Sequence, residues 1–181
     1  NYSSPRQVGT DTDWSYFSNA GARAGYAIKT DGTLWTWGSN SGALGHNNRT
    51  TYSSPRQVGT NTTWADNIQG NGQTTYMTKT DGTLWVNGQE QHGSLGLNGT
   101  SGSGISSPVQ MGTATDWNVV KSGNYSAYAS KTNGELWAWG QNQGYTLNLT
   151  TYSSPIQIPG TDWDLTNAQT LSATVHILRE Q

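Results

Sequence analysis

One ten-residue phrase occurs three times in this chain, as KTDGTLWTWG at residues 29–38, KTDGTLWVNG at 79–88 and KTNGELWAWG at 131–140. The first and third copies carry two tryptophans and the second carries one. A tryptophan side chain buries on the order of 150–250 Å² when it packs. Each copy is therefore expected to pack against a substrate, a partner or a neighbouring copy.

The phrase belongs to a longer repeat. YSSPRQVGT at 2–10 and 52–60 returns as ISSPVQMGT at 105–113 and YSSPIQIPGT at 152–161, and a tryptophan follows each of them. Counted from proline to proline, the units cover 5–54, 55–107 and 108–154, with a partial fourth over 155–181. Such self-similarity is typical of arrays in which a unit buries its apolar face only against its neighbours. We therefore expect a single repeat domain over residues 1–181.

Each unit is expected to consist of strands and tight turns. An Asp-Gly or Asn-Gly pair separates short runs rich in Thr, Tyr, Leu and Trp, which predicts a hairpin with a two-residue primed turn. Glycine supplies the positive φ of such a turn, so a turn role is favoured over a carboxylate site. The SSP segments lack strand alternation and are expected to be connections. The turn pairs are Asp31–Gly32, Asp81–Gly82 and Asn133–Gly134.

Side chains alternate along a strand, so Trp35 and Trp37 are expected on one face. Leu34 and Thr36 are then expected on the other. Tryptophans recur with every hairpin instead of clustering once, which favours packing between successive sheets over a ligand-stacking platform of the kind found in carbohydrate-binding modules. In the second unit Asn87 replaces the second tryptophan, so one contact between units must differ. The predicted structural anchors are Trp14, Trp35, Trp37, Trp64, Trp85, Trp117, Trp137, Trp139 and Trp163.

Four anchors in fixed order carry a resemblance to a known family. They are P-x-x-V, W, K-T-D-G-x-L-W-x-W-G and N-x-x-G-x-L-G, and successive repeat prolines lie 50, 53 and 47 residues apart. This pattern resembles the repeat of the regulator of chromosome condensation family, especially its bacterial and phage members. The resemblance implies an all-β fold, a β-propeller of four-stranded antiparallel blades that usually closes with seven blades. This chain supplies three complete repeats and a partial fourth, whereas seven blades would need roughly 350 residues.

The short series leaves three outcomes open. The ring closes at four blades with help from residues near the N-terminus, the chain is part of a longer propeller, or open ends pair with other copies. An incomplete blade presents unpaired N–H and C=O groups, and scarce charge gives little repulsion against association. We expect a structural protein that self-assembles into an extracellular or virus-associated filament or tube. The alternative is an adapter in a larger surface or phage tail protein, which recognises protein or glycan through its loops.

Composition argues against several other classes. Charged residues form 11% of the chain, and the nine Lys and Arg are scattered, so no nucleic-acid partner is expected. Without cysteine there are neither disulfides nor thiolate metal sites. No apolar run approaches 18 residues, so no membrane span is expected. Abundant Ser, Thr and Asn favour an extracellular or particle-borne location.

Motifs with known chemistry are missing from the sequence, and neither catalytic residues nor a cofactor is expected. His46 and His92 stand in equivalent loops without a neighbouring carboxylate, so a loop role is favoured over a metal site. No two carboxylates stand out as the pair that a glycosidase needs. Asp13, Asp116 and Asp162 each precede a tryptophan and are expected to hydrogen-bond to local backbone as turn residues.

Glycosylation is an additional hypothesis. Asn-x-Ser/Thr triplets and paired threonines stand in segments that are expected to be exposed, where a sugar would be solvated. The number of triplets is only slightly above chance for this composition. The candidates are Asn48, Thr50, Thr51, Asn98, Asn148, Thr150 and Thr151.

Overall fold

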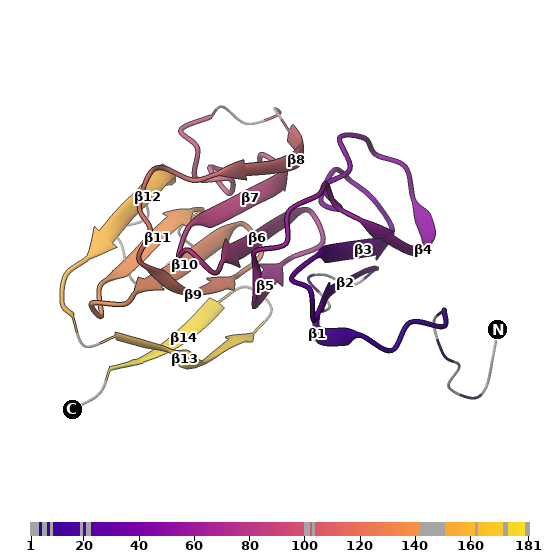
Figure 1. The fold of residues 1–181 in the computed structure, drawn as a ribbon. Coiled ribbons are helices and arrows are strands. Elements are labelled where there is room, and N and C mark those ends of the chain that lie inside the picture. The colour runs from indigo at the N-terminus through magenta and orange to yellow at the C-terminus, as the bar shows by residue number, and fades with distance from the viewer. Residues whose placement is uncertain are drawn as a thin grey trace.

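The fold is all-β, as the sequence predicts (Figure 1). The computed structural model describes residues 4, 7, 9–18, 20, 23–99, 102, 104–141, 151–161, 163–171 and 174–179. Apart from Leu165, only the backbone is described within 164–171 and 174–179. Strands in the described residues form three four-stranded sheets and one two-stranded sheet.

The strands follow one another in chain order within each sheet, and all neighbours are antiparallel. Blade 1 consists of β1 (Trp14–Ser18), β2 (Ala24–Lys29), β3 (Leu34–Gly38) and β4 (Tyr52–Gln57). Blade 2 consists of β5 (Trp64–Gly70), β6 (Thr74–Lys79), β7 (Leu84–Gln89) and β8 (Gly104–Gln110). Blade 3 consists of β9 (Trp117–Ser122), β10 (Ser126–Lys131), β11 (Leu136–Gly140) and β12 (Tyr152–Ile158). The last sheet pairs β13 (Trp163–Leu171) with β14 (Thr174–Arg179). Four-stranded up-and-down sheets of this kind are propeller blades.

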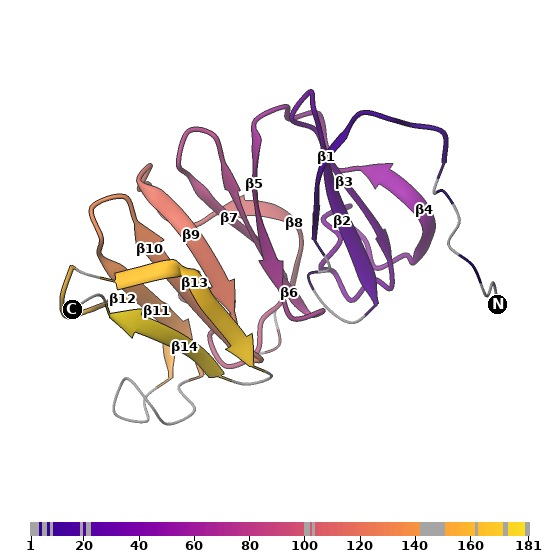
Figure 2. The same ribbon diagram turned by 90° about the horizontal axis from the view of Figure 1, so that it is seen from below.

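The sheets stand side by side in a row (Figure 2). The first strands β1, β5, β9 and β13 contact one another in succession. Blade 1 and the β13–β14 sheet lie at opposite ends of the row in both views (Figures 1 and 2). The described chain is therefore an open series of three complete blades, with a two-stranded sheet in the position of a fourth.

The Asp-Gly and Asn-Gly pairs lie in the hairpins between the second and third strands of the blades. In blade 1, Lys29 N donates to Thr33 O at 3.1 Å and Gly32 N donates to Lys29 O at 2.9 Å, so the loop has three residues. Gly32 has φ +79°, whereas Asp31 is not among the residues with positive φ. The predicted two-residue primed turn is wrong. A type I turn followed by a left-handed glycine bulge takes its place, because this loop also matches the twist of the two strands.

The SSP segments at 53–55, 106–108 and 153–155 are strands, so their prediction as connections is wrong, whereas the copy at 3–5 lies largely outside the described residues. The three strands are β4, β8 and β12, the outermost strand of each blade. In β4 the pairing passes from Thr36–Arg56 directly to Gly38–Tyr52, so residues 53–55 form a bulge. The same skip occurs in β8 and β12. Proline lacks an N–H donor and is tolerated on an outer strand or in a bulge, which explains the missing alternation.

The apolar core lies between the blades. Tyr26, Ile28 and Leu34 of blade 1 share one buried cluster with Ile68 and Met77 of blade 2. A second cluster joins blade 2 to blade 3, and a third joins blade 3 to the β13–β14 sheet. Each blade therefore has a leading face, which points to the preceding blade, and a trailing face, which points to the next. A single sheet cannot bury either face alone, which is the physical reason for a tandem repeat.

Candidate interaction surfaces

A lysine between two tryptophans recurs on the leading face of every complete blade. The two rings of a pair meet edge to face, with centroids 5.9, 6.0 and 6.1 Å apart in blades 1, 2 and 3. The lysine nitrogen lies over both rings, and in blade 2 it is 3.8 Å from the centroid of Trp85. Cation–π attraction adds to the burial of the rings. The three clusters are Trp14–Lys29–Trp35, Trp64–Lys79–Trp85 and Trp117–Lys131–Trp137.

In blades 1 and 3 an aspartate just before the first-strand tryptophan pairs with this lysine. Asp13 lies 3.2 Å from Lys29, and Asp116 lies 3.1 Å from Lys131. The sequence predicts that these side chains hydrogen-bond to local backbone as turn residues, whereas the structure pairs them with the lysine that the hairpin brings beside them. Asp162, the third predicted member, lies outside the described residues.

Blade 2 lacks this acidic partner, since Thr63 stands where the other blades have aspartate. The environments of the lysines differ accordingly. The hydrogen bond that Lys29 donates to the Asp11 carboxylate raises the pKa of Lys29, with Asp13 adding to the effect. Burial lowers the pKa of Lys79, and Asp81 only partly offsets this. The two rings are therefore the main groups that stabilise the ammonium charge of Lys79.

The second tryptophan of the repeated phrase bonds to the preceding blade. Trp139 donates from Nε1 to the carbonyl of Ser94 in blade 2 at 3.0 Å, and its ring meets that of Tyr76 edge to face. In blade 2 the equivalent Asn87 donates to the carbonyl of Ala43 in blade 1 at 2.7 Å. The contact at this position differs between units, as expected. Both side chains nevertheless donate to the carbonyl at the equivalent position in the loop of the preceding blade.

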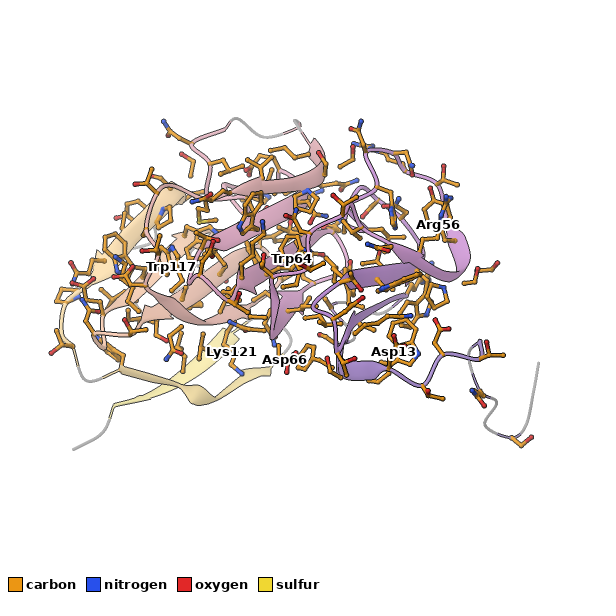
Figure 3. All side chains as sticks on the ribbon, viewed as in Figure 1. Asp13, Arg56, Trp64, Asp66, Trp117 and Lys121 are labelled. Atoms are coloured by element: carbon orange, nitrogen blue, oxygen red, sulfur yellow. The ribbon has the colours of Figure 1, made fainter. Side chains whose placement is uncertain are left out.

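Figure 3 places Trp64 and Trp117 between neighbouring sheets, while Arg56 lies on the outer strand β4. Trp64 and Trp117 are buried, and Trp139 is 2% exposed. The tryptophans of blades 2 and 3 thus pack between sheets. In blade 1, Trp14 and Trp37 are half-buried, whereas their equivalents Trp64, Trp117 and Trp139 are buried behind a preceding sheet. Trp35 is half-buried like its equivalents Trp85 and Trp137.

Two polar hollows open along the edge that carries the β3–β4 and β7–β8 loops. One, of about 450 Å³, is lined by residues from all three blades, including Arg23, Ser39, Gln73 and Tyr125. The other, of about 280 Å³, is lined by Arg49, Gln89, Glu90, Gln91, His92, Gly102 and Gly104. Guanidinium, amide and hydroxyl groups in such hollows are suited to binding polar ligands.

Glu90 is the buried acid of the smaller hollow. It is 2% exposed, and Oε2 accepts a hydrogen bond from Leu95 N at 3.1 Å, whereas Oε1 has no partner within the described chain. Burial raises the pKa of this carboxyl. At the equivalent position of blade 1, Asn40 accepts from Gly42 N and donates to the carbonyl of Thr50. The carboxylate lacks that donor, which leaves one oxygen unsatisfied.

Residues 31–69 match the regulator of chromosome condensation (RCC1) repeat. Chains of known structure share the fold. Prp20p from Saccharomyces cerevisiae has a TM-score of 0.71 over 83% of this chain at 18% identity. Human WBSCR16 has a TM-score of 0.71 over 86% at 17% identity, and yeast RCC1 (Prp20) bound to Kap60 has 0.77 over 93% at 16% identity. The chain spans only 40%, 40% and 43% of these proteins. No curated protein sequence matches it.

These likenesses establish an RCC1-type propeller fold, in which the two loop histidines make different contacts. His46 shares a hydrogen bond of 2.9 Å with Thr36 Oγ1, and burial lowers the pKa of its imidazole. His92 is exposed and packs edge to face on Tyr125. The part of the chain that the structure describes holds no group of three potential metal-binding side chains. Nor does it hold a helix long and apolar enough to cross a membrane.

The glycosylation candidates differ in their surroundings. Asn98, Thr50, Thr51 and Thr151 are exposed. The amide of Asn48 is half-buried and donates to His46 O and to the hydroxyl of Tyr52, both at 3.0 Å. A sugar on Asn48 would have to replace these bonds. Asn148 and Thr150 lie outside the described residues.

Sequence reasoning missed the repeat lysine, Glu90 and Phe17. The signal for the lysine was present, because each copy of the phrase begins with KT. Glu90 was visible as an acid where the first unit has Asn40. Phe17 left no such signal, since its exposure depends on which sheets stand beside blade 1.

Proposed function

We propose that this chain is a non-enzymatic structural repeat protein of bacterial or phage type. In this proposal, copies associate through blade edges and faces into an extracellular or virus-associated filament or tube. The observation that carries it is the open row, in which complete blades end on a two-stranded sheet. β13 and β14 stand where the other sheets have four strands, so the outer edge of β14 offers backbone donors and acceptors to another strand.

Charge and symmetry support association. The formal net charge is −2, which leaves little electrostatic repulsion between copies. If the first blade of one copy meets the last sheet of another, the contact is head-to-tail and generates a ring or a helical polymer. The proposed extracellular or virion location rests on the hydroxyl-rich composition, and exposed Asn98 and Thr51 are the glycosylation sites we favour. The intact mass of the native protein, compared with the 19.5 kDa bare chain, tests that modification.

Light scattering after size-exclusion chromatography, together with negative-stain electron microscopy, tests the assembly. We expect particles many times heavier than 19.5 kDa, with a regular repeat along their length. A monodisperse monomer across micromolar concentrations would contradict the proposal.

A binding adapter within a larger protein is the second candidate, and the two polar hollows favour it. The similar Prp20p has binding properties to Gsp1p and histones, and yeast RCC1 is found bound to Kap60, so protein recognition is a role of proteins with this fold. Screening the chain against glycan and protein arrays tests this function. Binding by a monomer that is lost in Arg49→Ala or Tyr125→Ala would favour the adapter over the polymer.

A further inference from the structure

The larger polar hollow is lined by the same backbone position of three successive blades. Arg23, Gln73 and Tyr125 each stand one residue before the second strand of their blade. The carbonyl of each accepts the N–H of the residue that follows the ten-residue phrase, at 2.9, 2.8 and 2.9 Å. The fold therefore fixes the backbone of this position and leaves the choice of side chain free.

The side chains at this position differ in every blade, although the backbone contact is the same. The opposite end of the row is nearly invariant, since its hairpins read KTDG, KTDG and KTNG. The second unit is the longest, and its extra residues fall in the β7–β8 connection, at the same end as the hollow. Insertions in a repeat array often mark its binding face. The end that carries the hollow is therefore the one on which recognition is expected.

Hydrogen bonds between blades hold the walls of the hollow in place. Ser41 Oγ donates to Gly72 O at 3.1 Å, which joins blade 1 to blade 2. Asn71 Nδ2 donates to Gly123 O at 3.3 Å, which joins blade 2 to blade 3. The same amide accepts the N–H of Gln73 at 3.0 Å through Oδ1. A ligand would meet walls that are already formed, which lowers the entropic cost of binding.

The charge of the hollow suits an anionic group. Arg23 is the only charged side chain among the described lining residues, and it is exposed. None of the ion pairs within the described chain involves its guanidinium. A guanidinium binds a carboxylate through two parallel N–H donors, which fixes the orientation of the carboxylate as well as its position.

The remaining lining groups suit a ligand with many hydroxyls. The hydroxyl of Ser39 and the amide of Gln73 both donate and accept hydrogen bonds, as sugar hydroxyls do. Tyr125 is half-buried, and its ring packs edge to face on that of His92 with centroids 5.2 Å apart, so a positioned ring is present for the C–H face of a sugar. The volume of about 450 Å³ lies within the range of small-molecule sites, roughly 300–1,000 Å³. A short acidic peptide would use the guanidinium but offers few hydroxyls to these walls.

We propose that this hollow binds an acidic oligosaccharide, with Arg23 on the carboxylate of a uronic or sialic acid, Tyr125 against the face of a sugar ring and Gln73 on the hydroxyls. The assignment rests on the adapter function, the second candidate above, and names its ligand class. The ligand lies at the loop end of the blades and leaves the sheet faces and outer strands free. Binding is therefore compatible with a monomer and with a polymer.

An array that pairs each sialylated or uronic-acid oligosaccharide with its neutral parent tests the ligand class. We expect acidic members to bind at least about tenfold more tightly than their parents, because a hydrogen bond between charged groups is involved. The preference should shrink at high salt, which screens exposed charges. A triglutamate peptide is the control for charge alone and should bind much more weakly. Equal binding of neutral parents, equal binding of the peptide, or no binding of any acidic member would overturn the proposal.

Exchanges between equivalent positions test the site, since each introduced residue already occurs there in another blade. Arg23→Gln copies blade 2 and should weaken binding of the acidic sugar at least about tenfold without changing that of the neutral parent. Tyr125→Gln should weaken binding of both sugars. Gln73→Arg copies blade 1 and should strengthen binding of the acidic sugar about threefold, because it adds a second guanidinium. Arg56→Gln, on the outer strand β4, is the control that should change neither.

These outcomes separate the ligand class from the function on which it rests. Capture of proteins that is lost in Arg23→Gln, with no acidic glycan bound, would refute the sugar and leave the adapter standing. Binding of acidic sugars that persists in Arg23→Gln and Tyr125→Gln would refute this hollow and also leave the adapter standing. A chain that binds nothing on a glycan or a protein array would refute both. Thermal unfolding checks that each variant is folded, and a gain of binding in Gln73→Arg cannot arise from misfolding.

Discussion

At the scale of single residues, the repeat lysine shows how one sequence position acquires different properties. Lys29 and Lys131 are held by aspartates and by two rings, whereas Lys79 has the rings and no aspartate before Trp64. The backbone at this position is the same in all three blades, since the carbonyls of Asp13, Thr63 and Asp116 each accept an N–H from the hairpin. The difference therefore lies in the neighbouring side-chain charges and in the burial of the lysine, not in the backbone.

Thr63→Asp should restore the missing partner of Lys79. We expect the pKa of Lys79 to rise, and the free energy of unfolding at pH 7 to increase by about 0.5–1 kcal/mol. The folded state of the wild type binds fewer protons than the unfolded state just below pH 10.5, so its stability rises with pH there. That slope should flatten in the variant. NMR titration of the lysine and urea denaturation measure both effects, and Thr63→Asn, which adds no charge, should reproduce neither.

Glu90→Gln should stabilise the protein at neutral pH. Because burial raises the pKa of Glu90 in the folded state, the folded state binds more protons between the usual pKa of 4.5 and the raised value. Stability of the wild type should therefore fall as pH rises through that window. The variant should gain about 1–2 kcal/mol above it and nothing below pH 4. Denaturation at pH 4 and pH 8 measures this, with exposed Asp66→Asn as the control that should show no such gain.

At the scale of elements, turns and bulges fix each blade to the next. The hairpin glycine lies against the connection that leaves its own blade, since a Cβ on Gly32 would stand 2.0 Å from Thr62 O. Gly32 O also accepts the N–H of Trp64 at 3.2 Å, which starts β5. The bulges of β8 and β12 accept the loops of the preceding blades. Glycine and proline in the repeat therefore serve contacts between elements as well as local geometry.

Gly32→Ala and Gly59→Ala form a matched pair for this interpretation. Both glycines have positive φ, but a Cβ on Gly59 meets nothing within 4 Å. Gly59→Ala should cost about 1 kcal/mol for the left-handed backbone alone. Gly32→Ala should cost at least about 2 kcal/mol more, because the backbone of Thr62 must move. Equal losses in thermal or urea unfolding would mean that the hairpin does not touch the connection.

At the scale of the whole molecule, stability comes from the interfaces between blades. The three buried clusters each join one sheet to the next, so a residue contributes according to whether a neighbouring sheet covers it. The open row gives the two ends different chemistry. Within the described residues, blade 1 presents aromatic rings on its leading face, and β14 pairs with β13 alone.

Trp139→Ala and Trp37→Ala should therefore differ although the residues are equivalent in the repeat. Blade 2 covers Trp139, so Trp139→Ala should lower the free energy of unfolding by about 3–5 kcal/mol. No sheet covers Trp37 among the described residues, so the loss of its side chain should cost less than half as much in the monomer. Urea unfolding of dilute samples, below the concentration of assembly, measures both losses. Similar losses would place the main stabilising contacts within the blades instead.

The sequence alone determined the repeat, the strands that flank each hairpin, the sites of the hairpins and the shared face of Trp35 and Trp37. These features depend on local alternation and on glycine in turns, which act over a few residues. The three-residue form of the hairpin escaped prediction because several loops match the same strand twist. The hollow around Glu90 escaped it because its walls come from two blades.

Only the tertiary structure decided that the SSP triplets of the three complete blades are bulged outer strands, and that two indoles, with an aspartate in blades 1 and 3, surround the lysine. It also decided that Phe17 is exposed while Ile68 and Val120, at the same position in the strand pairing of blades 2 and 3, are buried. Burial is set by whichever sheet stands about fifty residues away along the chain. The residues next to a position in the sequence do not determine whether that sheet is present.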